Sequence, residues 1–175
     1  MSKLEVDAIE PQSGTTLTLG ASGDTITIPS GATLTNSGTA TGFGKVLQVV
    51  SVTNTTQQTT TSGSYVASTG LTASITPSST SSKILISVMS NVRSSADAAY
   101  TLYRGATNLA GAGSFVQIYA GGADIRQLMT INYLDAPSTT SATTYTLYFL
   151  AGSGTAYINQ EGSKQGQIIL TEIGG

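Results

Sequence analysis

A short motif occurs three times near the start of the chain. Each copy reads Ser-Gly, one variable residue, Thr, an aliphatic residue and Thr, and the copies begin at Ser13, Ser22 and Ser30. Because threonine alternates with Leu or Ile in each copy, an extended chain would carry its aliphatic side chains on one face. Glycine after each serine is typical of a turn. The pattern predicts a β-repeat stem of short strands separated by tight turns.

This stem is too small to fold alone. Burying its aliphatic residues would contribute about 10 kcal/mol, whereas ordering about twenty backbone residues costs about 20 to 40 kcal/mol. Three copies closed around one axis would share a core and pair their strand edges. We therefore expect a homotrimer. A flexible Gly/Ser/Thr-rich linker remains the alternative, although a linker needs no regular phase. The expected stem core is Leu17, Leu19, Ile26, Ile28 and Leu34.

An arm precedes the stem, and a hinge follows it. In residues 1–12, the charged Lys3, Glu5, Asp7 and Glu10 are interleaved with the apolar Leu4, Val6 and Ile9. This alternation predicts a half-buried strand that docks on a partner, or one that packs on its own trimer. The segment TATGFG, residues 39–44, is typical of a hinge. We therefore expect two parts, an arm and stem over 1–44 and a knob over 45–175.

The knob has the pattern of an all-β domain. Apolar and hydroxyl residues alternate in about ten segments joined by Gly, Ser, Asn and Asp turns, which predicts a sandwich or barrel. We expect a two-sheet jelly-roll-like β-sandwich. The expected strands are 45–52, 64–68, 71–77, 83–92, 99–105, 114–120, 126–134, 143–150, 155–159 and 167–173.

The composition excludes most catalytic and metal chemistry. The chain has no Cys and no His, so thiol nucleophiles, imidazole bases and the usual zinc ligands are absent. Only 9% of its 175 residues are charged, against about 25% in ordinary proteins. The net charge of −2 offers no basic surface for nucleic acid. Polarity comes instead from 29 threonines and 23 serines.

No membrane or secretion signal is visible. No apolar run approaches the length of about 18 residues that a bilayer span needs, and residues 1–10 lack the pattern of a signal peptide. We expect no membrane partner, and synthesis and folding in a cytoplasm.

The remaining acidic residues do not predict an active site. None of them forms a close pair in the sequence, whereas glycoside hydrolysis needs two carboxylates about 5 to 9 Å apart. Asp24 and Asp135 are expected to cap their own turns rather than to bind calcium, and Gly42 to Lys45 lacks the spacing of a phosphate-binding loop. We expect no enzyme, no catalytic, metal or cofactor-binding residue, and no cofactor. The acids considered are Asp24, Asp97, Asp124, Asp135, Glu161 and Glu172.

Tyrosines and arginines offer two weaker indications. Most tyrosines fall within expected strands, so packing is the default interpretation, and a glycan platform is possible where a tyrosine reaches a loop. Arg93, Arg104 and Arg126 lie at or beside strand ends, where pairing with Asp97, Asp124 or Asp135 across protomers is expected. The tyrosines in question are Tyr100, Tyr103, Tyr119, Tyr133, Tyr145, Tyr148 and Tyr157.

Almost the whole chain resembles a family of phage proteins. The opening KLEVDAIEPQSGTTLTLGASGDTITIPSGATL is similar to the amino-terminal segment of bacteriophage fibre and virion surface proteins, especially those of phages that infect cyanobacteria and other marine bacteria. GLTASITPSSTSSKILISV, YLDAPSTTSATTYTLYF and the terminal LTEI resemble the globular domain of such proteins. The resemblance implies a homotrimer on the virion surface with a jelly-roll-like head, similar in layout to trimeric tumour-necrosis-factor-like domains.

Stem length favours one place on the virion. A coiled stem of three strand layers rises about 15 Å, and 26 fully extended residues span at most about 90 Å. This is a short peg without a long shaft, which favours a capsid-decorating (cement) protein whose arm and stem dock on the major capsid protein. The alternative is a short tail fibre or receptor-binding knob that binds host surface polysaccharide.

Overall fold

The computed structural model describes residues 9–38, 46–160 and 165–174. The chain divides into two compact units, Met1–Phe43 and Gly44–Gly175. The division lies beside the boundary expected after residue 44. The expected hinge at 39–44 and the arm residues Leu4 and Val6 lie outside the described residues.

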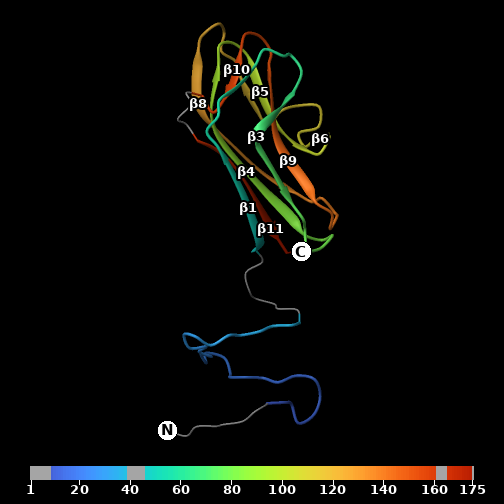
Figure 1. Cartoon of the computed structure of the whole chain (residues 1–175). Coiled ribbons are helices and arrows are strands. Elements are labelled where there is room, and N and C mark those ends of the chain that lie inside the picture. The colour runs from blue at the N-terminus through green and yellow to red at the C-terminus, as the bar shows by residue number, and fades with distance from the viewer. Residues whose placement is uncertain (1–8, 39–45, 161–164, 175) are drawn as a thin grey trace. The chain divides into compact units, whose positions relative to one another are not determined.

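The second unit is all-β in its described part (Figure 1). Its strands match the expected segments closely, with two differences. The segments 64–68 and 71–77 form one strand, which is irregular between Ala67 and Thr72. Two very short strands, Gln58–Thr60 and Thr107–Asn108, were not expected. The strands are Val46–Asn54 (β1), Gln58–Thr60 (β2), Val66–Ile75 (β3), Lys83–Ser94 (β4), Ala98–Arg104 (β5), Thr107–Asn108 (β6), Val116–Ile118 (β7), Ile125–Asp135 (β8), Thr143–Ala151 (β9), Ala156–Ile158 (β10) and Gly166–Ile173 (β11).

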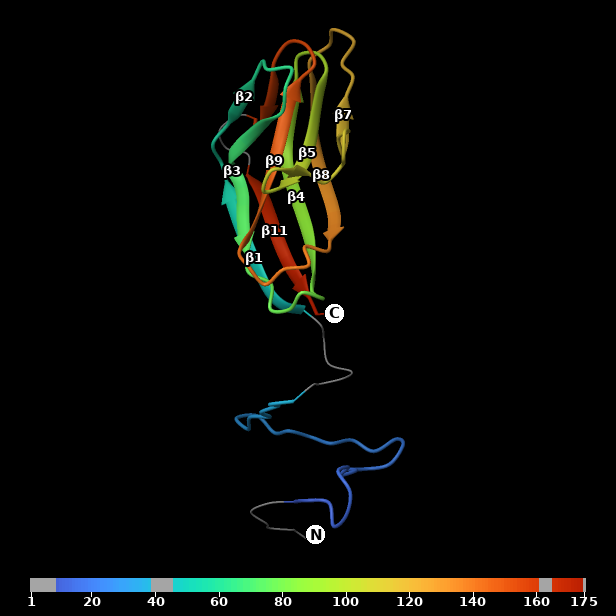
Figure 2. The same ribbon diagram turned by 90° about the vertical axis from the view of Figure 1, so that its right-hand side faces the viewer.

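The strands form two antiparallel sheets that pack as a sandwich (Figures 1 and 2). In the first sheet, β4 pairs with β8 along one edge, and with β11 and then β10 along the other edge. Strand β1 pairs with β11, and β2 pairs with β10. The pairs β1 with β2 and β11 with β10 therefore act as two long, interrupted strands. The first sheet is effectively four strands wide.

The second sheet has the same effective width. Strand β9 lies between β3 and β5, and the other edge of β5 pairs with both β6 and β7. The two sheets bury their inner faces against each other, and burial alternates residue by residue along β4, β9 and β11. The largest fully buried side chains include Tyr100, Tyr145 and Phe149. The expected all-β sandwich is thus confirmed.

Asn159 occupies the interruption of the long strand formed by β10 and β11. Its backbone is left-handed, with φ of 51°, and its side chain is fully buried. The Asn159 amide nitrogen donates to the Asn54 carbonyl oxygen at 3.0 Å and to the Thr56 carbonyl oxygen at 3.3 Å. Its amide oxygen accepts from the Ser90 hydroxyl at 2.9 Å. One side chain thus satisfies backbone groups where the ladder between β1 and β11 stops.

We predict that Gly70→Ala destabilises the sandwich. A Cβ at position 70 would overlap the Asn54 side chain, which is held by bonds from Asn159 and from the Thr56 N–H. We expect the free energy of unfolding in urea to fall by about 2 kcal/mol. Gly63→Ala is the control, because its Cβ would lie 4.0 Å from the nearest atom. Equal stability of the two variants would contradict this account.

The first unit contains turns but no strand within residues 9–38. The glycine of each motif has a left-handed backbone, with φ of 77° at Gly14, 95° at Gly23 and 86° at Gly31. Glycine adopts this conformation without steric cost, which explains its place in every copy. The Asp24 carboxylate accepts from the Ala21 N–H at 2.7 Å, which confirms its expected role in its own turn. Strand pairing between copies of the stem stays a prediction, since the structure holds one chain.

Candidate interaction surfaces

All of the expected stem aliphatics are exposed in the single chain. Their exposed fractions lie between 42% at Leu17 and 62% at Leu34. Ile9 of the arm is also exposed, at 55%. Apolar side chains of this size are normally buried when a partner surface exists. The regular row therefore lacks a partner within the described chain. The intermediate members are Leu19, Ile26 and Ile28.

The first sheet carries a second exposed aliphatic surface on its outer face. In one cross-strand row, Val49 lies opposite Thr171, which lies opposite Leu85, which lies opposite Leu134. Val49 and Leu134 are 59% and 48% exposed. Val46 and Leu47 extend this surface at the start of β1, with 59% and 53% exposure. We call these residues, Val46, Leu47, Val49, Leu85 and Leu134, the aliphatic end of the first sheet.

This surface was not predicted from the sequence. The segment VLQVVSV holds apolar residues on both faces of the strand, and that departure from simple alternation was its only signal. Val50 and Val52 pack against the core. Val49 therefore points outward, whereas the register shift between Val46 and Gln48 interrupts the alternation and leaves both Val46 and Leu47 exposed.

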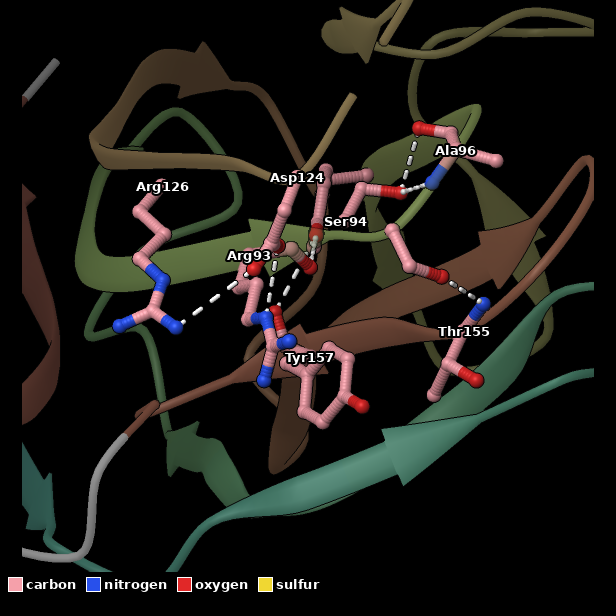
Figure 3. A network of polar contacts seen from close by, with 9 residues as sticks. Arg93, Ser94, Ala96, Asp124, Arg126, Thr155 and Tyr157 are labelled. Carbon is pink, nitrogen blue, oxygen red and sulfur yellow. Dashed lines mark hydrogen bonds and ion pairs between the residues drawn. The ribbon is translucent and has the colours of Figure 1, made fainter. Parts of the chain in front are cut away.

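The opposite end of the same outer face carries charged residues, and Figure 3 shows their contacts. The Arg93 Nε donates to Asp124 Oδ1 at 2.7 Å, and an Arg126 nitrogen lies 3.5 Å from Asp124 Oδ2. The Arg93 guanidinium also lies 4.7 Å from the centre of the Tyr157 ring, within the range of a cation–π contact. The hydrogen bond from Arg93 lowers the pKa of the Asp124 carboxyl.

These ion pairs form within one chain. Arg93 and Arg126 were expected to reach a partner protomer, but both contact Asp124 of their own chain. The antiparallel register explains this, because Arg93 on β4 lies directly opposite Arg126 on β8. Asp124 immediately precedes β8, and it therefore lies beside both guanidinium groups.

Asp135 forms the most enclosed ion pair. Arg104 donates to its two carboxylate oxygens at 2.9 Å and 2.8 Å, and the Tyr145 hydroxyl donates to Oδ2 at 2.6 Å. Burial raises the pKa of the Tyr145 hydroxyl, and the adjacent carboxylate raises it further. The expected capping of its own turn by Asp135 is therefore wrong: the residue ends β8 and joins it to β5 and β9. The expected Arg104 pair across protomers is likewise made within the chain.

Glu172 is fully buried and accepts three hydrogen bonds at its carboxylate. The Ser78 N–H and hydroxyl donate to Oε1 at 2.7 Å and 2.6 Å, and the Gln48 amide donates to Oε2 at 2.6 Å. Burial raises the pKa of this carboxyl, but the hydrogen bonds from Ser78 and Gln48 outweigh that effect and lower it to about 2. Glu172 thus fastens the segment after β3 to β1 and β11.

Five of the six acids considered as catalytic candidates lie in the described residues, and each bonds to another group of the chain: Asp24, Asp97, Asp124, Asp135 and Glu172. Asp97 accepts from the Ala120 N–H at 3.2 Å, and Glu161 lies outside the described residues. No group of three or more His, Cys, Asp or Glu residues that could hold a metal ion occurs in residues 9–38, 46–160 and 165–174. The absence of catalysis stays a prediction.

The tyrosines mostly pack, as expected, with one exception. Tyr100 and Tyr145 are in the core, Tyr103 stacks on Tyr148 with ring centres 3.9 Å apart, and Tyr133 contacts Phe115. Tyr119 differs, because it is 73% exposed. It follows β7 directly, at the position where a tyrosine reaches a loop.

The fold and the exposed repeat define the class of protein to which this molecule belongs. The molecule is an all-β protein with a two-sheet sandwich and an exposed aliphatic amino-terminal repeat. No family model matches the chain, and a search of curated proteins found no match. Within the described residues, no helix has the length and apolar character needed to cross a bilayer.

We predict that Glu172→Gln makes the sandwich less stable in a pH-dependent way. The folded pKa of about 2 lies below the ordinary glutamate value of 4.5, so the carboxylate stabilises the fold fully above pH 4.5 and progressively less as the pH falls toward 2. Urea unfolding should show a loss on the order of 2 kcal/mol at pH 7, shrinking below pH 4.5. Glu10→Gln, at an exposed position, is the charge-matched control. A loss that is constant with pH would contradict the assignment.

Proposed function

We propose that this protein is a homotrimeric bacteriophage virion protein that decorates and stabilises the capsid through its amino-terminal arm and stem. The observation that carries the proposal is the exposed, regularly spaced aliphatic row of the stem. These side chains can be buried only against a partner. Identical copies related by a rotation axis would bring the same aliphatic residues together at the same level along that axis. The resemblance of the chain to phage virion surface proteins supports the same assignment.

The strand order supports the jelly-roll-like architecture expected of such a knob. Counted with β1/β2, β6/β7 and β10/β11 as single long strands, the first sheet has the order 1-8-3-6 and the second 2-7-4-5. Two nested Greek keys of eight strands produce this order. The knob would then be a compact jelly-roll head.

The aliphatic end of the first sheet fits a trimer. Seven residues separate the described stem from Val46, so closing three stems around an axis would hold three β1 starts near each other. The exposed Val46, Leu47 and Val49 lie at that start. Contact between copies there would remove a continuous apolar surface from water. We therefore propose a second copy of this chain as the partner of this surface.

The arm supplies the proposed contact with the capsid. Leu4, Val6 and Ile9 would add a strand to an exposed edge of the major capsid protein, and the charged residues between them would set its register. Ile9 is exposed and free to make such a contact in the described chain. Cementing then requires only surface shared among neighbouring capsid subunits.

We predict that Leu19→Ser with Ile28→Ser disrupts the trimer and leaves the sandwich folded. The two substitutions remove apolar surface from the stem core, so sedimentation should show a shift from trimer to monomer with an unchanged β-sheet circular dichroism spectrum. Thr18→Ser with Thr27→Ser is the matched control, because these residues alternate with the aliphatic ones. Trimers of the double Ser variant that assemble normally would refute this account of the stem.

We predict that many copies of this chain bind each virus particle and that this binding depends on the arm, residues 1–12. Quantitative mass spectrometry of virus particles should find hundreds of copies of the full chain if it decorates the shell, and particle binding should fall on deletion of residues 1–12. A few dozen copies or fewer would favour the second candidate, a short tail fibre or receptor-binding knob. Undiminished binding of the truncated chain would exclude the arm as the anchor.

A further inference from the structure

A hollow opens on the outer face of the second sheet, beside Tyr119. Its volume is about 210 Å³, and the residues around it include Asp97, Ala99, Gln117, Tyr119, Leu150 and Gly152. It lies where β5 begins and β9 ends, since Ala98 pairs with Ala151. Strand β4 connects the two ends of the sandwich. It begins at Lys83, which pairs with Ile173, and it ends at Ser94, shortly before β5 begins. The hollow is therefore at the opposite end of the sandwich from the start of β1 and the end of β11, two strands that lie side by side in Figure 1.

The register of the sheet explains the hollow. Ala99 lies directly between Leu150 on β9 and Gln117 on β7. A methyl group between two longer side chains leaves a depression with an apolar floor. The exposed Tyr119 forms one wall, and its hydroxyl donates to the Gln117 amide oxygen at 2.7 Å. This bond restrains the ring at the edge of the hollow.

Polar groups stand at the rim. One Asp97 carboxylate oxygen accepts from the Ala120 N–H, which fixes the carboxylate, and the second oxygen accepts no hydrogen bond from the residues that the structure describes. The Gln117 amide nitrogen is a second group without a hydrogen bond within that part of the chain. A restrained carboxylate and an amide together accept from and donate to neighbouring hydroxyl groups.

We propose that this hollow binds one neutral pyranose residue of a polysaccharide. The flat ring of Tyr119 and the Leu150 and Ala99 floor would contact the C–H face of the sugar, while Asp97 and Gln117 would bond to its hydroxyls. The volume is below the 300–1,000 Å³ of pockets for drug-sized ligands, which limits the occupant to about one ring. The Asp97 carboxylate repels anions, so phosphate and uronic acids are disfavoured. The hollow forms within one chain, so the proposal is independent of trimerisation and of the shell-decorating function.

Titration of the full-length protein by NMR tests the proposal. The probes are methyl α- and β-glycosides of glucose, galactose and mannose, with methyl glucuronoside and inorganic phosphate as anionic comparators. We expect saturable amide shifts confined to residues 97–99, 117–120 and 150–152 for at least one neutral glycoside, and weaker binding of both anions. The absence of such shifts for every neutral glycoside, or tighter binding of an anion, would overturn the proposal.

Variants separate binding from fold. Tyr119→Ala should raise the dissociation constant for the glycoside at least tenfold. Tyr119→Phe retains the ring, so it should raise the dissociation constant less. Ala99→Leu should fill the floor and abolish binding. Leu128→Ala is the matched control, because Leu128 is a 58% exposed residue on the other sheet. The affinity of this variant for the glycoside should equal that of the wild-type protein. Equal affinity of Tyr119→Ala and the wild-type protein would refute the site. Since Tyr119 is exposed, this variant should fold even if Ala99→Leu does not.

Discussion

Aliphatic burial in a nearly uncharged chain is the constraint on which the rest of the structure depends. Within the sandwich the two-residue period sends Ile, Val and Leu inward and hydroxyl residues outward. The stem has the same alternation, but within one chain no second layer packs against its aliphatic side chains, so Leu19 and Ile28 remain exposed to water. The same sequence pattern therefore produces a domain with its own hydrophobic core in one part of the chain and a segment with exposed aliphatic residues in the other.

The scarcity of charge gives each carboxylate in the described part of the sandwich a structural role. Asp135 neutralises Arg104 and holds Tyr145, and Glu172 collects donors from two neighbouring segments. Buried carboxylates of this kind depend on complete hydrogen bonding, because an unpaired one is costly. With so few charges to distribute, pairing within the chain is satisfied first. Arg93 and Arg126 share Asp124, which lies beside both of them because of the antiparallel register of β4 and β8.

Local pattern predicted the strands well because their alternation is regular. It separated 155–159 from 167–173 correctly, but it did not predict the role of Asn159, since only tertiary packing shows that one buried amide bonds to Ser90 and to the Asn54 carbonyl where the ladder between β1 and β11 stops. It divided β3 in two at Gly70, where the structure has an irregular but continuous strand. Asp135 before Ala-Pro resembled a turn cap, and its partner on β5 was invisible from local sequence. The hollow was also hidden, because it arises from the register of Ala99 between two other strands. The sequence placed Tyr119 inside the expected strand 114–120, and its exposed position just after β7 follows only from the structure.

The pairing of Val46 with Ile173 has a mechanical consequence. Tension between the start of β1 and the end of β11 would open their hydrogen bonds one after another, as in a zipper. Tension between the start of β1 and the far end of the sandwich would instead load the whole ladder in shear, with its bonds sharing the force. A protein held by its amino-terminal segment and pulled at its far end would experience the second, stronger geometry.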